Sequence, residues 1–486
     1  MAKTLKEKTA QGLMWGAVNN GTMQVLNLLI GIVILRQLTP EDTGLIGMLA
    51  IFSAIAGNLQ SSGFSTALIN EKQPTAQQYN SVFWFNILMG GLLYALLFLS
   101  APLIAMFFRQ PRLTDLSRFL FLAFFISSFG ISTHAYMLKN MMNREIAIVN
   151  LIALTLSGTT AIVMALSGMG YWSLAWQQVV NSAMLVLGRF YYVKWRPSLT
   201  FTFGYIRQTF SFSMKILVTM MINTVNQNLL TVIFGRLFRD ARVVGNFFQA
   251  YKWDSMAFQT VGGMVGQVAQ PVLVEVRQAA DHPSTNGREL QVFRKMLRFT
   301  AFLSFPALFG LALVAREFIL CTIGEEWINC VPLLQILCLS GAFMPLYTLY
   351  QNLVISHGRS DINMWLNIGQ VALQLAVILL FYQQGITTMV IAYAVFNVLW
   401  LCSWQPSAHR MIGLCARHVL KDTLPFLLAA AGAMALTWLA TRWLPLSLWL
   451  LLSCRVIMAA VLYAAVLKTA HAHILDECLQ YLKKRS

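Results

Sequence analysis

Long apolar stretches, each followed by a short polar break, recur along the whole chain and limit what it can fold into. A helix needs about 20 apolar residues to cross the hydrocarbon core of a membrane. About fourteen stretches reach that length: residues 12–35, 43–69, 81–108, 115–138, 146–167, 171–193, 208–234, 243–274, 293–315, 328–355, 361–383, 386–406, 422–443 and 447–469. Backbone in lipid must satisfy its own hydrogen bonds, so stretches this long predict helices rather than barrel strands. We therefore expect an all-α membrane protein.

Composition and motifs exclude most soluble enzymes. Hydrophobic residues make up 57% of the 486 residues and charged residues only 11%, whereas soluble domains carry roughly 25% charged residues. The sequence has no GxxxxGK[ST], HExxH or GxSxG motif and no metal-ligand spacing. We expect a protein that is not an enzyme and has no resident cofactor or metal.

The positive charge follows the loops. The formal net charge is +17, and 22 of the 35 Lys and Arg residues lie on the N-terminal side of the predicted membrane, against nine on the other side. Cytoplasmic loops of membrane proteins are enriched in Lys and Arg, so both termini are expected in the cytoplasm. No soluble segment is long enough for a nucleic-acid recognition fold, and nucleic acid is not expected as a partner.

A weak internal repeat suggests two halves. A shift of 201 residues aligns Gly44 with Gly245, and the first two apolar stretches with the seventh and eighth. Parallel bundles related by an axis along the membrane normal produce such a repeat. The predicted parts are an N-terminal lobe (1–193), a cytoplasmic connector (194–207), a C-terminal lobe (208–406), and a C-terminal helix pair with a cytoplasmic tail (407–486). Each lobe would hold six helices.

Charged residues inside apolar stretches are costly and are often functional. Lys215, Lys252, Asp254 and Arg455 are the candidates. Lys252 and Asp254 are two residues apart, so they should point to different helix faces and not pair directly. One interpretation is a water-filled cavity whose cations attract an anionic substrate; the other is structural ion pairs or snorkelling lysines. Arg189, near a stretch end, is expected to snorkel.

Amide side chains gather in the same stretches. The candidates for contact with sugar are Asn19, Asn20, Gln24, Asn223, Asn226 and Gln249, together with the aromatic ring of Tyr251. Gln259 and Gln267 continue the series. Amides hydrogen-bond sugar hydroxyls, and aromatic faces cover the apolar face of a sugar ring. The alternative is that the amides only join neighbouring helices. Cys321 and Cys330 flank one loop and could pair if it faces an oxidising compartment.

Several loop and helix-end segments resemble a known family. These are Leu35-Arg36-Gln37-Leu38-Thr39-Pro40-Glu41-Asp42, Ser62-Gly63-Phe64-Ser65-Thr66-Ala67 and Gly324-Glu325-Glu326-Trp327. They are similar to the polysaccharide transporter family, which includes the Wzx-type flippases, of the multidrug/oligosaccharidyl-lipid/polysaccharide exporter superfamily. The resemblance implies two six-helix lobes around a central cavity in the bacterial inner membrane. It also implies that undecaprenyl-diphosphate-linked oligosaccharides cross the membrane by alternating access, with H⁺ or Na⁺ as the coupling ion. The matching segments lie away from the cavity charges, so the resemblance assigns no site residue.

The hypothesis from the residues gives each candidate a role. Lys215 and Lys252, with Arg455 as a further cation, would neutralise the diphosphate or acidic sugars. Asp254 would couple transport to an ion, because a buried carboxylate can take up a proton. Membrane lipids would surround the protein, and a glycan polymerase or glycosyltransferase would be its neighbour. A multidrug/cation antiporter of the same fold would need acidic cavity residues, and a glycan polymerase or glycosyltransferase would need a sizeable external loop.

Overall fold

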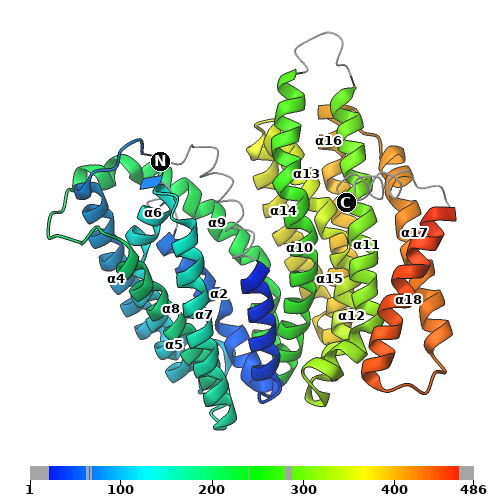
Figure 1. Ribbon diagram of the computed structural model, residues 1–486, viewed down its shortest axis with the longest axis horizontal. Coiled ribbons are helices and arrows are strands. Elements are labelled where there is room, and N and C mark those ends of the chain that lie inside the picture. Colours follow the sequence, from blue (N-terminus) through cyan, green and yellow to red (C-terminus); the bar gives the residue numbers. More distant parts are fainter. Residues whose placement is uncertain are drawn as a thin grey trace, which may run out of the picture. The chain divides into compact units, whose positions relative to one another are not determined.

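The computed structural model describes residues 21–469, apart from 62–64, 66–67, 70, 239 and 280–286. Within these ranges the chain forms helices joined by turns, and no strand is found (Figure 1). Among the described residues, eight helical segments are long and apolar enough to cross a membrane: α4 (Ala76–Phe108), α7 (Asn143–Leu166), α11 (Arg288–Thr322), α12 with α13 (Cys330–Gly341 and Met344–Ser356), α14 (Ser360–Leu380), α15 with α16 (Ile386–Trp400 and Gln405–Ile412), α17 (Ala416–Thr441) and α18 (Leu448–Thr469). The protein is therefore a multi-pass membrane protein.

Further helices lie outside this set; the first is a shorter apolar helix and the others are long. They are Gly21–Leu35, α2 (Pro40–Ser61), α8 (Tyr171–Tyr192), α9 (Phe203–Leu237) and α10 (Ala241–Ala279). The helices α5 (Leu113–Ser128) and α6 (Ile131–Lys139) make one further span if the bent pair is counted together. The prediction of an all-helical membrane protein is confirmed, and the number fourteen stays a prediction.

Contacts divide the chain into two compact units, residues 1–245 (unit 1) and residues 246–486 (unit 2). In unit 1, α7 packs on α8, α4 on α5, and α2 on α9. In unit 2, α11 packs against α12, α17 and α18, which places the last two helices beside it (Figure 1). The first residues of α10 belong to unit 1 and the rest of this helix to unit 2.

A side chain of α8 contacts the bend between α5 and α6. The two helices meet at 43° around Gly130. The guanidinium of Arg189 donates a hydrogen bond to the Gly130 carbonyl at 3.2 Å. The Arg189 guanidinium therefore has a carbonyl acceptor within unit 1, and its expected snorkelling toward the membrane surface stays a prediction.

A reciprocal backbone contact joins the beginnings of α2 and α10. A Cβ atom added to Gly44 would overlap the Ala241 carbonyl oxygen, and one added to Gly245 would overlap the Pro40 carbonyl oxygen. Glycine is required at both places because the two backbones touch. Pro40 and Ala241, which begin the two helices, are separated by 201 residues, as are Gly44 and Gly245. Residues that the repeat aligns therefore contact each other.

Two carboxylates at the beginning of α2 reinforce this contact. The Glu41 carboxylate pairs with Arg112 at 2.9 Å and lies 3.9 Å from Arg242 on α10. The Asp42 carboxylate accepts hydrogen bonds from the backbone N–H groups of Thr39 and Tyr171, both at 3.0 Å. These contacts tie the beginning of α2 to the α4–α5 turn, to α8 and to α10.

The glycine contact gives a prediction about stability. Replacement Gly245→Ala should destabilise the protein by about 1–3 kcal/mol, because overpacking forces the two backbones apart. Gly432→Ala on α17 is the matched control, since nothing lies within 4 Å of a Cβ added there; it should be neutral or stabilising by roughly 0.5–1 kcal/mol. Thermal unfolding in detergent measures both. Equal melting temperatures for Gly245→Ala and the natural protein would contradict the contact.

Candidate functional site

Several predicted site residues fall outside what the structure describes. Asn19 and Asn20 precede the described residues. Lys215, Asn223 and Asn226 lie on α9, where the helix is described but these side chains are not. Their roles stay predictions.

Exposed polar residues form a stripe along one face of α10. Lys252, Gln259, Gly263 and Gln267 are all exposed. Their spacings of seven, four and four residues place them on one face, because an α-helix has 3.6 residues per turn. The stripe runs for about 22 Å along the helix axis. A polar face of this length on a membrane helix calls for water, protein or a polar ligand as its neighbour.

A cavity of about 500 Å³ lies between this stripe and α13. It is lined by Phe258, Gln259, Gly262, Gly263, Gly266, Gln267, Thr348 and Asn352. We call it the polar trough. Its wall offers amide donors and acceptors, a hydroxyl and an aromatic ring, which are the groups that bind sugars. Sequence analysis identified Gln259 and Gln267, but not their partners on α13.

Glycines keep the trough open. A Cβ added to Gly262 would lie 3.5 Å from the Thr348 hydroxyl, and one added to Gly266 would lie 3.7 Å from the Asn352 amide nitrogen. Nothing lies within 4 Å of a Cβ added to Gly263. Side chains are tolerated here sterically, so the glycines leave free volume rather than permit a helix crossing.

Asp254 points the other way, into unit 2. Its side chain is 3% exposed, whereas Lys252 is exposed. One residue is exposed and the other buried, so they lie on different faces of the helix, and no ion pair joins them. A Cβ added to Gly341 of α12 would overlap the Asp254 carboxylate, so only glycine leaves room for this group. The oxygen Oδ1 has no hydrogen-bond partner within the described part of the chain.

Tyr251 and Gln249 are not on the open face. The ring of Tyr251 stacks on Phe247, with centroids 6.0 Å apart. Gln249 is 2% exposed, and its amide nitrogen lacks a hydrogen-bond partner in the described ranges. Gln24, on the helix Gly21–Leu35, is exposed. Of the amides singled out above, the structure therefore brings Gln259 and Gln267 to one cavity and places Gln249 elsewhere.

A second group of amides, missed by sequence reasoning, joins α13, α14 and α15. The Tyr347 hydroxyl lies 2.7 Å from Asn367 Oδ1 and 2.8 Å from Gln370 Oε1. The Gln370 amide donates to Asn397 Oδ1 at 3.0 Å. Asn367 and Gln370 are three residues apart, so a one-face pattern was visible. These contacts are interhelical, and they stiffen the helix that supplies Thr348 and Asn352.

Arg455 has a buried acidic partner. Its guanidinium lies 2.8 Å from the Glu317 carboxylate and donates to the Thr441 hydroxyl at 3.0 Å. This pairing joins α18 to α11 and α17 and favours the structural interpretation of Arg455. Asp422 on α17 is likewise paired with Arg294, with contacts of 2.6 and 3.1 Å. Both acids lie at the edge of predicted stretches, 293–315 and 422–443, which is why they were missed.

Other predicted chemistry concerns metals and disulfides. Among the described residues, no group of three or more His, Cys, Asp or Glu side chains could hold a metal ion. Cys321 and Cys330 are both buried, and no disulfide bond joins them. The alternative in which these two cysteines pair is therefore wrong for this structure.

The chain resembles proteins of known name along most of its length. Residues 33–332 match the family model described as polysaccharide biosynthesis protein. Over 437 residues the chain is 25% identical to the lipopolysaccharide biosynthesis protein WzxC of Escherichia coli (strain K12), covering 88% of this chain and 86% of WzxC. It is 22% identical over 435 residues to the succinoglycan biosynthesis transport protein ExoT of Rhizobium meliloti (strain 1021), covering 88% and 83%.

The fold also has a solved counterpart. The lipid II flippase MurJ, in an inward closed conformation, superposes with a TM-score of 0.72, covering 95% of this chain and 100% of MurJ at 12% identity. At that identity the likeness concerns the fold alone. The family match spans more than half of the chain and agrees with the resemblance seen in its loops. The chain thus belongs to the family of polysaccharide biosynthesis proteins.

Proposed function

We propose that the protein moves an oligosaccharide linked to undecaprenyl diphosphate across the bacterial inner membrane by alternating access. The observation that carries this proposal is the polar trough, because it presents sugar-binding groups on a membrane helix. The names of ExoT, a transport protein, and MurJ, a lipid II flippase, support transport rather than catalysis. The trough chemistry suits a hydroxyl-rich ligand without specifying which glycan.

The wider layout belongs to the same proposal. We infer fourteen transmembrane helices in two six-helix lobes around a cavity, followed by the C-terminal helix pair, with both termini in the cytoplasm. The reciprocal contact of Pro40 and Gly44 with Ala241 and Gly245 supports the lobes, since an axis of pseudo-symmetry brings equivalent residues together. The excess of Lys and Arg on one side supports the orientation.

Different residues are assigned to binding the substrate and to binding the coupling ion. Lys252 lies on the same face as the trough, and we assign it to the diphosphate or acidic sugars, together with Lys215. Asp254 is assigned to the coupling ion, H⁺ or Na⁺, because it is buried and Oδ1 lacks a hydrogen-bond partner in the described chain. The lipid-linked glycan and membrane lipids are the expected partners, with a glycan polymerase or glycosyltransferase acting next to it.

The alternatives fit this site less well. A multidrug/cation antiporter would place carboxylates where a cation binds, yet the described exposed stripe holds a lysine and amides. A glycan polymerase would need reacting groups in contact with the sugar, and the lining of the trough contains no ionisable side chain.

Deletion with complementation tests the function. Loss of the gene should remove the surface glycan and trap lipid-linked repeat units in the cytoplasmic leaflet. The natural protein should restore export, and Lys252→Ala should lower it about tenfold, because a hydrogen bond to a charged group contributes roughly 1.5–3 kcal/mol. Lys468→Ala, an exposed lysine at the end of α18, is the control. Unpolymerised units already outside the membrane in the deletion strain would indicate a polymerase and contradict the proposal.

A second prediction fills the trough. Gly263→Leu should abolish most export while the protein remains folded, because the new side chain enters open space and occupies the sugar path. Gly432→Leu adds the same side chain to an equally open position on α17 and should export normally. Export and melting temperature are measured for both variants. Normal export by Gly263→Leu would remove the trough from the transport path.

The third prediction concerns coupling. Asp254→Asn keeps the shape of the side chain against Gly341 but removes the charge and the titratable proton. In proteoliposomes this variant should bind glycolipid normally but should lose the dependence of transport on a Na⁺ or pH gradient. Measuring transport with and without each gradient separates the two ions. A gradient dependence equal to that of the natural protein would exclude Asp254 from coupling.

A further inference from the structure

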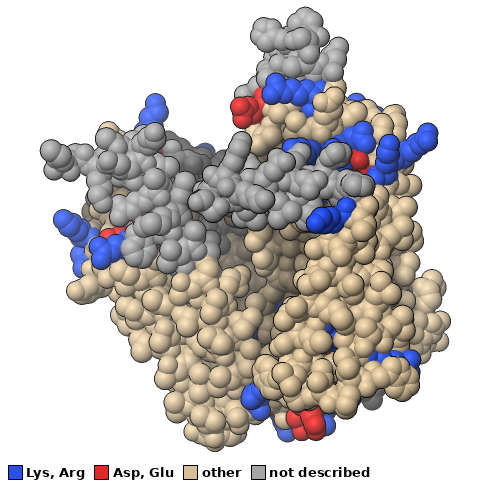
Figure 2. Space-filling model, turned by 45° about the vertical axis from the view of Figure 1, so that its right-hand side comes forward, with Lys and Arg blue, Asp and Glu red and all other residues tan. Residues whose placement is uncertain are grey.

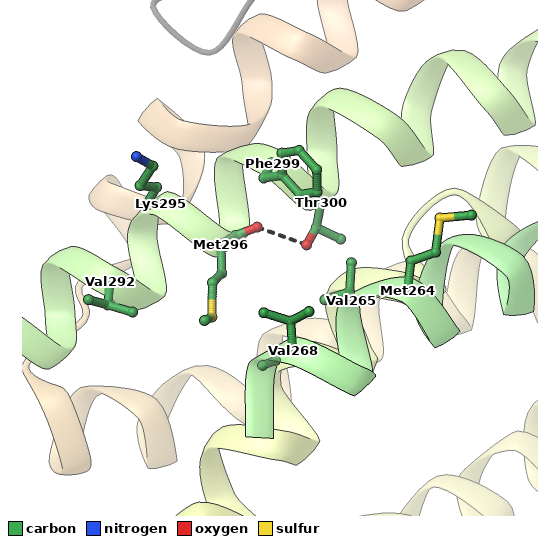
Figure 3. Close-up of a pocket in the computed structure, with 9 residues that line it drawn as sticks. Met264, Val265, Val268, Val292, Lys295, Met296, Phe299 and Thr300 are labelled. Atoms are coloured by element: carbon green, nitrogen blue, oxygen red, sulfur yellow. Dashed lines mark hydrogen bonds between the residues drawn. The ribbon is translucent and has the colours of Figure 1, made fainter. Parts of the chain in front are cut away.

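A second cavity, of about 280 Å³, lies between α10 and α11. Its lining residues are Met264, Val265, Val268, Ala269, Val292, Lys295, Met296, Phe299 and Thr300. We call it the apolar pocket. Figure 3 shows Met296 of α11 and Val265 and Val268 of α10 pointing into the gap between the helices. The Thr300 hydroxyl donates a hydrogen bond to the Met296 carbonyl at 2.8 Å. A molecule bound in the pocket therefore does not need to supply a hydrogen-bond acceptor to this hydroxyl.

The pocket opens to the surface of unit 2. Met264 and Val268 are each 58% exposed, although both are large apolar side chains. Filling this pocket with water would leave its apolar wall hydrated, which is unfavourable. In a membrane protein a hydrocarbon chain is therefore the favoured occupant. The geometry therefore selects a flexible apolar chain as occupant.

The apolar pocket and the polar trough share one helix at one level. Gln267 lines the trough and the next residue, Val268, lines the pocket. One residue step rotates the side chain by about 100° around the helix. Gly263 and Met264 repeat the arrangement one turn earlier. The helix α10 thus offers a polar and an apolar surface to two parts of a single amphipathic molecule.

One basic residue lines the pocket on the α11 side, and two others lie close to it in the sequence. Lys295 is exposed, with its ammonium turned away from the apolar side chains (Figure 3). Its neighbours Arg294 and Arg298 share one carboxylate, Asp422, at 2.6 and 3.8 Å. The beginning of α11 thus carries these three basic side chains. In Figure 2, Lys and Arg gather at the end of unit 2 where α11 begins, above a flank that is nearly uncharged. An anionic group attached to the apolar chain is favoured here.

We propose that the apolar pocket holds the polyprenyl chain of the lipid-linked substrate, with the diphosphate beside Lys295, which leaves Lys252 for acidic sugars of the glycan. This inference rests on the proposed function, which supplies the glycan that would occupy the trough. The diphosphate suits the cation cluster better than the single phosphodiester of a bilayer phospholipid, because it carries more negative charge. The chain and the sugar of one molecule then lie on two faces of α10.

A photoreactive polyprenyl diphosphate without sugar tests the pocket. The full-length protein is placed in phosphatidylcholine nanodiscs, irradiated with the probe and digested, and labelled peptides are identified by mass spectrometry. Labels are expected on the segments that contain Met264, Val268 and Met296. Excess undecaprenyl diphosphate should remove the label, whereas excess phospholipid should not.

Matched variants separate the pocket from the general lipid surface. Val268→Trp should lower labelling about tenfold, since losing the burial of two methylene groups changes an equilibrium by that factor. Val461→Trp is the control, because Val461 on α18 is 61% exposed and lies outside the pocket. Lys295→Ala should also weaken labelling, and Lys468→Ala should not.

The outcomes distinguish the two proposals. Labelling that phospholipid removes as well as undecaprenyl diphosphate does would identify an ordinary lipid site and overturn the inference. Glycan export that survives Val268→Trp, with no label in the pocket, would overturn it while leaving the proposed function intact. Specific labelling in a protein whose deletion leaves glycan export unchanged would keep the pocket and refute the proposed function.

Discussion

The close approach of α2 and α10 at their first turns is the constraint on which the structure depends. Gly44 contacts the Ala241 carbonyl, and Gly245 contacts the Pro40 carbonyl. In each case the carbonyl of one helix fills the space that a side chain on the other helix would need. The Glu41 carboxylate, which also pairs with Arg112, lies near Arg242 across the same contact. Because α10 begins in this contact and continues into unit 2, the contact fixes the beginning of the helix that carries both cavities.

The sequence predicted the helices better than their partners. Apolar stretches long enough to span a membrane leave little choice of secondary structure, and the placement of Lys252 and Asp254 on different faces followed from helix periodicity alone. The repeat of 201 residues also indicated that Gly44 and Gly245 are equivalent. It could not show that they touch, since a repeat gives correspondence and not proximity.

Partners across long sequence separations were the part that could not be predicted. Glu317 and Arg455 are 138 residues apart, and Asp422 lies 128 residues from Arg294. Each acid sits at a stretch end, where a charge looks like an ordinary surface residue. Only the α10 side of the trough was predicted from the sequence. The glutamines of α10 stand out in an apolar stretch, whereas Thr348 and Asn352 of α13 do not. Tertiary packing decides which amides face a cavity and which, like Gln370 and Asn397, face each other.

The buried carboxylates show why Asp254 differs from the others. Burying a charge is expensive unless a partner compensates for it. Glu317 and Asp422 have arginine partners at 2.8 and 2.6 Å, and these pairs hold α17 and α18 against α11. Asp254 is as deeply buried, yet no arginine or lysine pairs with it in the described chain, and Gly341 leaves its oxygens room. A carboxylate kept in such a place without a fixed cation is suited to a cation that comes and goes, while the fixed pairs keep the surrounding helices in place.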